Sequence, residues 1–162
     1  MLGSHLSALA PSDRSHVRLR ARALIGDDQA ILCLYPVLFI PPLNEQLLVD
    51  TGYAVVDRLA VDIETATGVL MVPPLPWPPL QSGIDQAGHA STAGPQPITA
   101  IITMDPNYLS PAAVACAIAQ AAMSGDRSRV LETSVRLTEQ ANVRRVSISD
   151  RGGLQRVLEA TS

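Results

Sequence analysis

Very few residues of this chain combine the type and the setting that chemistry requires. His89 lies in the glycine-containing segment Gln86–Ser91, and imidazole and carboxylate groups are the side chains that bind metal ions or move protons. The acids that could join it in a carboxylate–imidazole cluster are Glu45, Asp50 and Asp150. The competing interpretation is that His89 is an ordinary exposed loop residue and that Asp50 belongs to the polar face of a helix.

A second group of residues could hold an anion. Arg151, Gly152 and Gly153 directly precede a short predicted helix over residues 154–160, and the free backbone N–H groups at a helix N-terminus attract negative charge. The arginine would add a positive charge to them. Two adjacent glycines are equally typical of a tight strand-to-helix turn that binds nothing, so the sequence leaves both interpretations open.

The elements that must position these residues are short apolar runs and amphipathic segments. Continuous apolar character predicts buried strands at residues 30–35, 69–72, 98–104 and 143–148. Apolar spacing and capping residues predict helices at residues 45–61, 112–123, 126–140 and 154–160. Strands that alternate with helices imply a parallel sheet with helices on its faces. We therefore expect an α/β fold, a three-layer α/β/α domain with a mostly parallel sheet.

Three of the predicted helices have distinctive features. Ser110-Pro111 is a helix start, with serine as N-cap and proline at the first helical position. The alanine-rich helix that follows is apolar nearly all round, so we expect it to be buried. The apolar residues of the two amphipathic helices are Leu48, Val49, Val55, Val56 and Leu59 in the first, and Val130, Leu131, Val135 and Leu137 in the second.

The arginine-rich segment between residues 14 and 22 has two interpretations. Residues 16–22 alternate charged and apolar side chains, as a half-exposed strand does. The same segment places Arg14, Arg18 and Arg22 on one face of a helix. In either case we expect the arginines to form a solvated face, with an anion site as the alternative.

A proline-rich segment, residues 73–97, is expected to be one long irregular loop. Loops of this length are uncommon in compact domains and often contact a neighbouring molecule. Trp77, between Pro76 and Pro78, is the side chain that we expect at such an interface. The alternative is that Trp77 covers the edge of the sheet as part of the core.

Composition narrows the class of protein. Hydrophobic residues make up 47 % of the 162 positions, which predicts a single folded domain over residues 1–162, with residues 1–15 as a flexible or short helical lead-in. The net charge of −3 offers no concentrated positive field for nucleic acid. No apolar run is long enough to span a membrane. Cys33 and Cys116 stand alone in apolar runs, which predicts two buried free thiols and a cytoplasmic location.

Four segments resemble the creatininase family of amidohydrolases and follow one another in the family's order. They are residues 42–60, 69–77, 97–110 and 142–153. The resemblance covers most of the chain from residue 30 to residue 160. It implies the α/β/α fold, assembly into oligomers, and zinc or manganese ions that activate water against the C–N bond of a cyclic amide.

This chain departs from the family at most of its metal ligands. Gln46 stands where the family has an aspartate, Arg151 stands where it has a histidine, and residues 36–42 contain no acid and no histidine. A neutral amide is a poor metal ligand and a guanidinium group repels a cation. The resemblance therefore implies a hydrolase-like pseudoenzyme without a cofactor.

Three functions follow as hypotheses. The first is a degenerate creatininase-like protein that acts as a non-catalytic subunit or scaffold in a homo- or hetero-oligomer, in contact with itself or with an intact member of the family. The second is a metal-dependent amidohydrolase with a rearranged site around His89, which would bind zinc or manganese with acids such as Glu45. The third is a module that binds a small anion through Arg151 and the glycine amides. We expect no nucleic-acid or membrane partner.

Overall fold

A computed structural model of the chain describes residues 15–34, 47, 50–56, 60–72, 89–90, 93–103, 110–145 and 151–160. The strands in these ranges are β1 (His16–Leu19), β2 (Arg22–Ile25), β3 (Ala30–Cys33), β4 (Ala54–Val56), β5 (Val61–Glu64), β6 (Val69–Val72), β7 (His89–Ala90), β8 (Ala93–Thr103), β9 (Ala122–Ser124) and β10 (Asn142–Arg145). The helices are α3 (Pro111–Ala121), α4 (Arg127–Gln140) and α5 (Arg151–Ala160).

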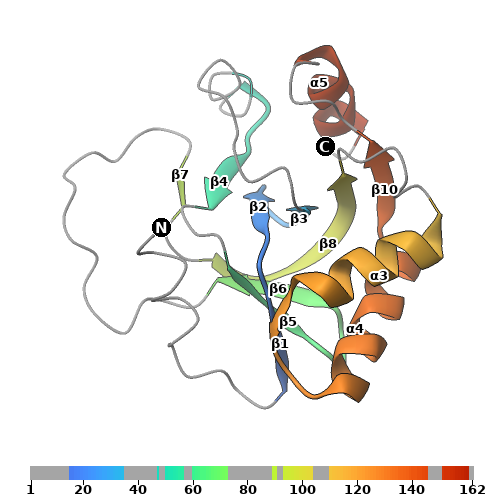
Figure 1. Cartoon of the computed structure of the whole chain (residues 1–162). Helices are drawn as coiled ribbons and strands as arrows, with labels where there is room; N and C mark the ends of the chain where they lie inside the picture. Colours follow the sequence, from blue (N-terminus) through green and yellow to red (C-terminus); the bar gives the residue numbers. More distant parts are fainter. Residues whose placement is uncertain are drawn as a thin grey trace.

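The strands form one mixed, mostly antiparallel sheet that curls into a half-barrel (Figure 1). Their order is β7-β4-β2-β3-β8-β6-β5-β1-β9, and β10 pairs with β8 beside this path. Among the described strands, β8 is parallel to β3 and β10, and β4 is parallel to β7, whereas the other pairs are antiparallel. The expected three-layer α/β/α fold with a mostly parallel sheet is therefore wrong.

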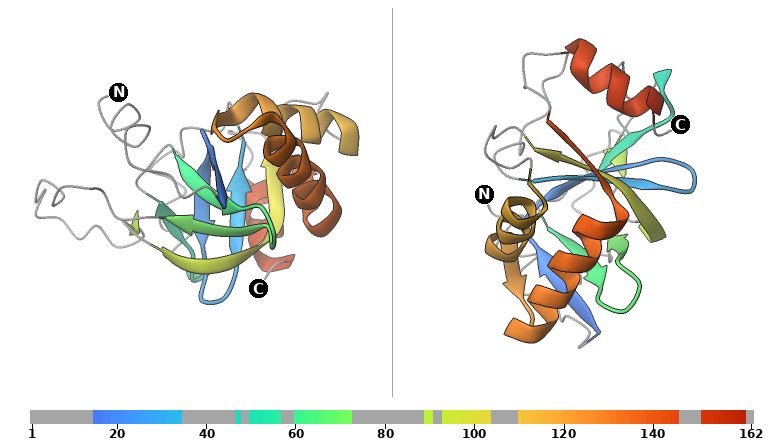
Figure 2. Two further views of the ribbon diagram at one scale, coloured as in Figure 1. Left: turned by 90° about the horizontal axis from the view of Figure 1, so that it is seen from below. Right: turned by 90° about the vertical axis from the view of Figure 1, so that its right-hand side faces the viewer.

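The long strand β8 joins the two halves of the curl. Its first part pairs with β6, with Pro97 opposite Val69, and its second part pairs with β3, with Ala100 opposite Ile31. On the other side of the molecule β1 and β2 follow each other after a short break, yet β1 pairs with β5 and β2 pairs with β3. Strand β8 and the β1–β2 segment therefore each run from one half of the sheet into the other. Figure 2 shows the resulting curvature of the sheet.

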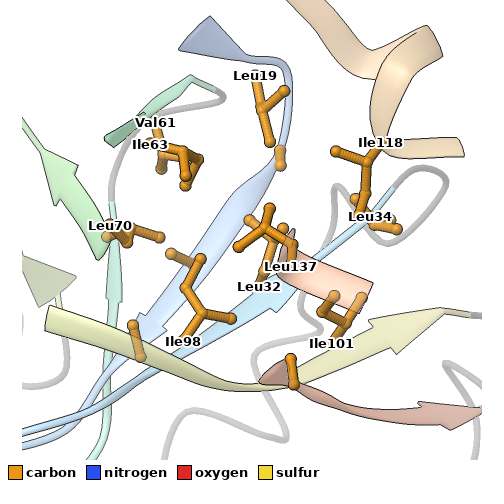
Figure 3. Close-up of a cluster of buried hydrophobic side chains, with 14 of the residues drawn as sticks. Leu19, Leu32, Leu34, Val61, Ile63, Leu70, Ile98, Ile101, Ile118 and Leu137 are labelled. Atoms are coloured by element: carbon orange, nitrogen blue, oxygen red, sulfur yellow. The ribbon is translucent and has the colours of Figure 1, made fainter. Parts of the chain in front are cut away.

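The core consists of two clusters on opposite faces of the central strands. One cluster lies within the curl and includes Leu19, Leu32, Ile63, Leu70, Ile118 and Leu137 (Figure 3). The other lies on the far face, where α5 covers the sheet, and includes Leu24, Ile31, Val55, Ile102 and Leu158. Successive side chains of a strand point to opposite faces, and both faces are buried at β2 and β3. Every buried position of these two strands is therefore apolar.

This double burial explains why the fold class was mispredicted. Residues 30–33 are indeed a fully buried strand, as the apolar run predicted. A continuous apolar run indicates that both faces of a strand are covered, and it says little about the direction of the neighbouring strands. Here the other half of the curl covers one face and α5 covers the opposite face, so both faces are buried although most of the strand pairs are antiparallel.

The helix expected over residues 45–61 is wrong in its second half. Residues 54–56 form β4, and residues 61–64 form β5. Gly52 has a φ of 78°, which ends a right-handed helix, and Thr51 still donates its backbone N–H to the carbonyl of Leu47 over 3.1 Å. The β-branched pair Val55-Val56 then favours a strand.

The two helices after β8 begin where the sequence predicted. The Ser110 hydroxyl accepts the backbone N–H of Ala113 over 3.2 Å at the start of α3, and the Asp126 carboxylate accepts that of Arg129 over 2.9 Å at the start of α4. Helix α3 ends two residues earlier than expected, because residues 122–124 form β9 beside β1. Its burial is also partial, since only Val114 and Ile118 are fully buried.

Helix α5 begins at Arg151, three residues before the predicted start. Its residues Val157 and Leu158 pack on the outer face of the sheet, away from α3 and α4. Within the described part of the chain, no helix has both the length and the apolar character needed to cross a membrane.

Candidate functional site: the outer face of helix α4

Helix α4 is fixed to the half-barrel by its inner face. Leu137 belongs to the core within the curl, and Thr133 and Ser134 are buried beside it. The Ser134 hydroxyl donates to the carbonyl of Val130 over 2.7 Å, so this buried polar group is satisfied within the helix. Small residues at these positions let the helix lie close to the strands.

The turn between β5 and β6 holds α4 from the side. Arg136 donates its Nε to the carbonyl of Thr65 over 2.9 Å, and Gln140 donates its amide to the carbonyl of Gly68 over 3.1 Å. A Cβ added at Gly68 would lie 2.6 Å from the amide oxygen of Gln140, so glycine permits this close approach. The helix is therefore anchored along its length, and its outer face has a fixed orientation.

The outer face of α4 exposes two large apolar side chains. Leu131 is 52 % exposed and Val135 is 48 % exposed, and they are the exposed large hydrophobic residues among those that the structure describes. They lie one helical turn apart, so they form a continuous stripe. Figure 2 shows α4 on the outside of the molecule, beside α3.

A hollow of about 360 Å³ lies over this stripe. Its described lining comes entirely from α4, with Glu132, Arg136 and Glu139 next to Leu131 and Val135. The part of its lining that α4 provides has an apolar flank and a charged flank. We name these five residues the α4 face. An apolar stripe bordered by charged residues is the usual composition of a protein contact surface.

Charges near the α4 face are held in order by pairs within the helix. The Nη2 of Arg136 lies 3.4 Å from a carboxylate oxygen of Glu132, and the Nε of Arg129 lies 2.6 Å from a carboxylate oxygen of Asp126. Hydrogen bonding from the Arg129 backbone N–H lowers the pKa of Asp126, so this N-cap is a carboxylate at neutral pH. The charged flank thus presents both signs.

A buried ion pair joins two strands of the sheet. Arg18 on β1 is directly opposite Asp62 on β5, and its Nε and Nη2 donate to the two carboxylate oxygens over 2.6 and 2.8 Å. The residues are only 3 % and 6 % exposed. The hydrogen bond with Asp62 raises the pKa of Arg18. Contrary to our expectation, Arg18 does not belong to a solvated face, and the helical interpretation of residues 16–22 is wrong because this segment forms β1 and the start of β2. Arg14 lies outside the described residues.

A second polar cluster ties together the turns at one edge of the sheet. Gln29 donates to the Tyr53 hydroxyl over 2.8 Å and accepts from the Thr99 hydroxyl over 3.1 Å, while Gln96 donates to the carbonyl of Gly26 over 3.0 Å. These bonds connect the β2–β3 hairpin with β8 and with the start of β4. These three bonds join one element of the fold to another.

The structure places only some of the site residues that the sequence suggested. His89 lies on β7, which pairs with β4 through Val55, and Asp50 is an exposed residue shortly before β4. Glu45, Asp150, Trp77, Pro76 and Pro78 lie outside the described residues. Within the described residues, no three His, Cys, Asp or Glu side chains come close enough to hold a metal ion. The described residues therefore do not form the carboxylate–imidazole cluster around His89 that the sequence suggested.

The segment suggested for an anion lies inside a helix. Arg151, Gly152 and Gly153 form the first turn of α5. The expected irregular loop over residues 73–97 is also shorter than predicted, because residues 89–90 and 93–97 are in β7 and β8. The anion site stays a prediction.

The sequence analysis missed the α4 face because it treated the four apolar residues of this amphipathic helix as one set. Val130 and Leu137 do pack inward, but Leu131 and Val135 are turned outward. Their phase contained the signal, because Val130, Leu137 and Ala141 follow one helical stripe while Leu131 and Val135 follow a second. Of the two cysteines, both free, Cys33 is buried as expected and Cys116 is exposed.

Comparison with known proteins adds no relative to this description. No family model, no curated protein and no solved structure gives a significant match to the chain.

Proposed function

We propose that this protein is a non-catalytic interaction subunit that binds a protein partner through the α4 face. The observation that carries the proposal is the exposure of Leu131 and Val135 on a helix whose opposite side is firmly anchored. A fixed apolar stripe loses little conformational freedom on binding, and burying it removes two large side chains from water. The α/β/α creatininase-like architecture has no part in this proposal, since the sheet is a half-barrel.

Polar side chains that bond to one another within the sheet support the same function. Arg18 and Asp62 satisfy each other inside the sheet, where they hold β1 against β5. The Gln29, Tyr53 and Thr99 side chains likewise bond to one another. These groups contribute to the rigidity of a scaffold, and a rigid scaffold is what an interaction surface requires.

The two cysteines support a cytoplasmic setting as part of the proposal. Both are free, and Cys116 is exposed. Exposed free thiols are typical of reducing compartments, because an oxidising one would promote their pairing.

Native sizing of the tagged protein, after covalent crosslinking in its own intact cells to retain complexes that would dissociate on dilution, tests the proposal. The wild-type chain is expected to elute well above its own mass of 17.2 kDa. The double variant Leu131→Gln/Val135→Gln should shift to the monomer position, because it removes the apolar stripe and leaves the inner face of α4 unchanged. The control is Ala112→Gln/Ala160→Gln, which places the same side chains at exposed positions of α3 and α5 and should behave as wild type. A wild-type chain that elutes at its own mass would contradict the proposal.

A further inference from the structure

We infer that the partner at the α4 face is a second copy of this chain, bound so that the two α4 helices lie antiparallel. The inference rests on the proposed function and adds to it the identity of the partner. It is carried by the order of charged and apolar residues along the face, which is complementary to itself.

The symmetry of such a pair is simple. A two-fold axis perpendicular to both helices, at the level of Ser134, places residues at equal distances before and after Ser134 at the same height. It also turns like flanks toward each other, so the apolar flank of one copy meets the apolar flank of the other. This is the isologous contact that closed dimers use.

The apolar flanks interdigitate in this arrangement. Leu131 is three residues before Ser134 and Val135 is one residue after it. At a rise of about 1.5 Å per residue, Leu131 lies about 3 Å along the axis from the partner's Val135. The four side chains therefore alternate along the axis, as packed apolar side chains do in antiparallel helix pairs, and none remains against water at the centre.

The charged flanks are complementary in the same register. Glu132 is two residues before Ser134 and Arg136 is two residues after it, so each faces its opposite charge on the other copy. Arg129 and Glu139, five residues before and after, form a second pair of opposite sign. In the single chain the side chains of Glu132 and Arg136 are 56 % and 39 % exposed, so they are accessible to such a neighbour.

A parallel pairing does not have this complementarity. A two-fold axis along the helices would turn the charged flank of one copy toward the apolar flank of the other. Glu132 and Arg136 would then lose hydration against Leu131 and Val135 without gaining a partner, which is unfavourable. The antiparallel arrangement is therefore the one that the sequence of the face selects.

The size of the face sets the strength of the dimer. A single helix of 14 residues contributes one side of its surface, which is below the roughly 800 Å² per partner of stable interfaces. We therefore expect a reversible dimer with a dissociation constant on the order of 0.1 mM.

Sedimentation analysis of the purified chain over a range of concentrations tests the dimer. The wild type should move from monomer to dimer. Glu132→Arg and Arg136→Glu should each weaken self-association about tenfold, since each places like charges opposite each other. An equimolar mixture of the two variants should recover the wild-type affinity as a heterodimer, because both cross pairs are then of opposite sign. Intrahelical repulsion is the same in each chain alone and in the mixture, so it cannot produce the recovery.

A second measurement does not depend on the charge variants, since Arg136→Glu also removes the bond to Thr65. Val135→Cys in a Cys116→Ser background should form a covalent dimer with a short bis-maleimide linker, whereas Ala112→Cys in the same background should not.

The outcomes separate the two proposals. A wild-type chain that stays monomeric at millimolar concentration, or a dimer that neither charge variant weakens, overturns the antiparallel pair. If the complex in extracts is still lost in Leu131→Gln/Val135→Gln, the α4 face binds a different protein, and the proposed function stands without this partner.

Discussion

The buried pair of Arg18 and Asp62 gives the sharpest prediction about the scaffold. Replacing Asp62 with leucine leaves the Arg18 guanidinium buried on β1 without the two carboxylate oxygens that it contacts at 2.6 and 2.8 Å. Arg18 is 3 % exposed, so water cannot replace those contacts unless the strands separate. The single substitution is therefore expected to damage the joint between β1 and β5.

The magnitude follows from the desolvation of the charge that remains. Removing one partner of a buried ion pair costs about 3–5 kcal/mol of unfolding free energy. For a chain of this size this lowers the melting temperature by roughly 6–20 °C. The double variant Arg18→Met/Asp62→Leu removes both charges and should lie within about 1 kcal/mol of wild type, because a pair of apolar side chains of similar volume packs as well.

Urea denaturation followed by circular dichroism measures these differences, and a thermal melt gives the second estimate. Glu132→Gln is the matched control, since it breaks an exposed pair and should change the unfolding free energy by less than about 0.5 kcal/mol. The reasoning fails if Asp62→Leu costs no more than this control, or if the double variant is as unstable as the single one.

Three further predictions concern the thiols and the turn under α4. Burial raises the pKa of Cys33 to about 12, so a thiol reagent at pH 8 should modify Cys116 rapidly and leave Cys33 unmodified; two equally fast thiols would contradict the assigned burial. The ordinary pKa of a thiol is about 9, so above that pH Cys33 ionises in the unfolded chain but stays protonated in the folded one. The contribution of Cys33 to the free energy of unfolding should therefore fall as the pH rises toward 12. Gly68→Ala should destabilise the fold by more than Gly52→Ala: both have positive φ, which costs about 1–2 kcal/mol with a side chain, but only the former meets Gln140. Equal losses in denaturant titrations would show that this contact has no energetic weight.

Local signals in the sequence were reliable where one residue type decides the structure. Ser110 caps α3, as the Ser110-Pro111 pair predicted, and the apolar run at residues 30–33 is a buried strand. The same applies to residues 69–72, which form β6. These features depend on hydrogen bonds or burial that neighbouring residues determine.

The pairing of the strands could not be predicted in this way. Nothing near residues 69–72 indicates that they pair antiparallel with β8, because Val69 and its partner Pro97 are far apart in the sequence. Only the pairing with β5, which precedes β6 across a short turn, is local. The helix assigned to residues 45–61 failed for a related reason, since the adjacent β-branched residues Val55 and Val56 fit a loose helical spacing and fit a short buried strand equally well. Periodicity over so few residues does not separate the two.

The apolar residues of the α4 face can be identified in the sequence, but the sequence analysis did not recognise that they lie on a second side of the helix. The four apolar residues of this amphipathic helix were not divided between two sides of it. The small side chains of Thr133 and Ser134 at the inner face leave Leu131 and Val135 to solvent. A helix with apolar residues on two sides indicates two contacts, one with its own domain and one with a neighbour.

The position of β8 at the joint of the curl has a consequence for how the chain folds. Its partners β3, β6 and β10 come from segments that precede it and from one that follows α4, so every pairing closes a long stretch of backbone. Such a high contact order slows the search for the native state, since the entropy of loop closure must be lost before the strands gain their hydrogen bonds. Until β8 pairs with β3 and β6, the edges of these two strands can form hydrogen bonds with other chains. We therefore expect the docking of β8 to be the folding step that protects the chain from aggregation.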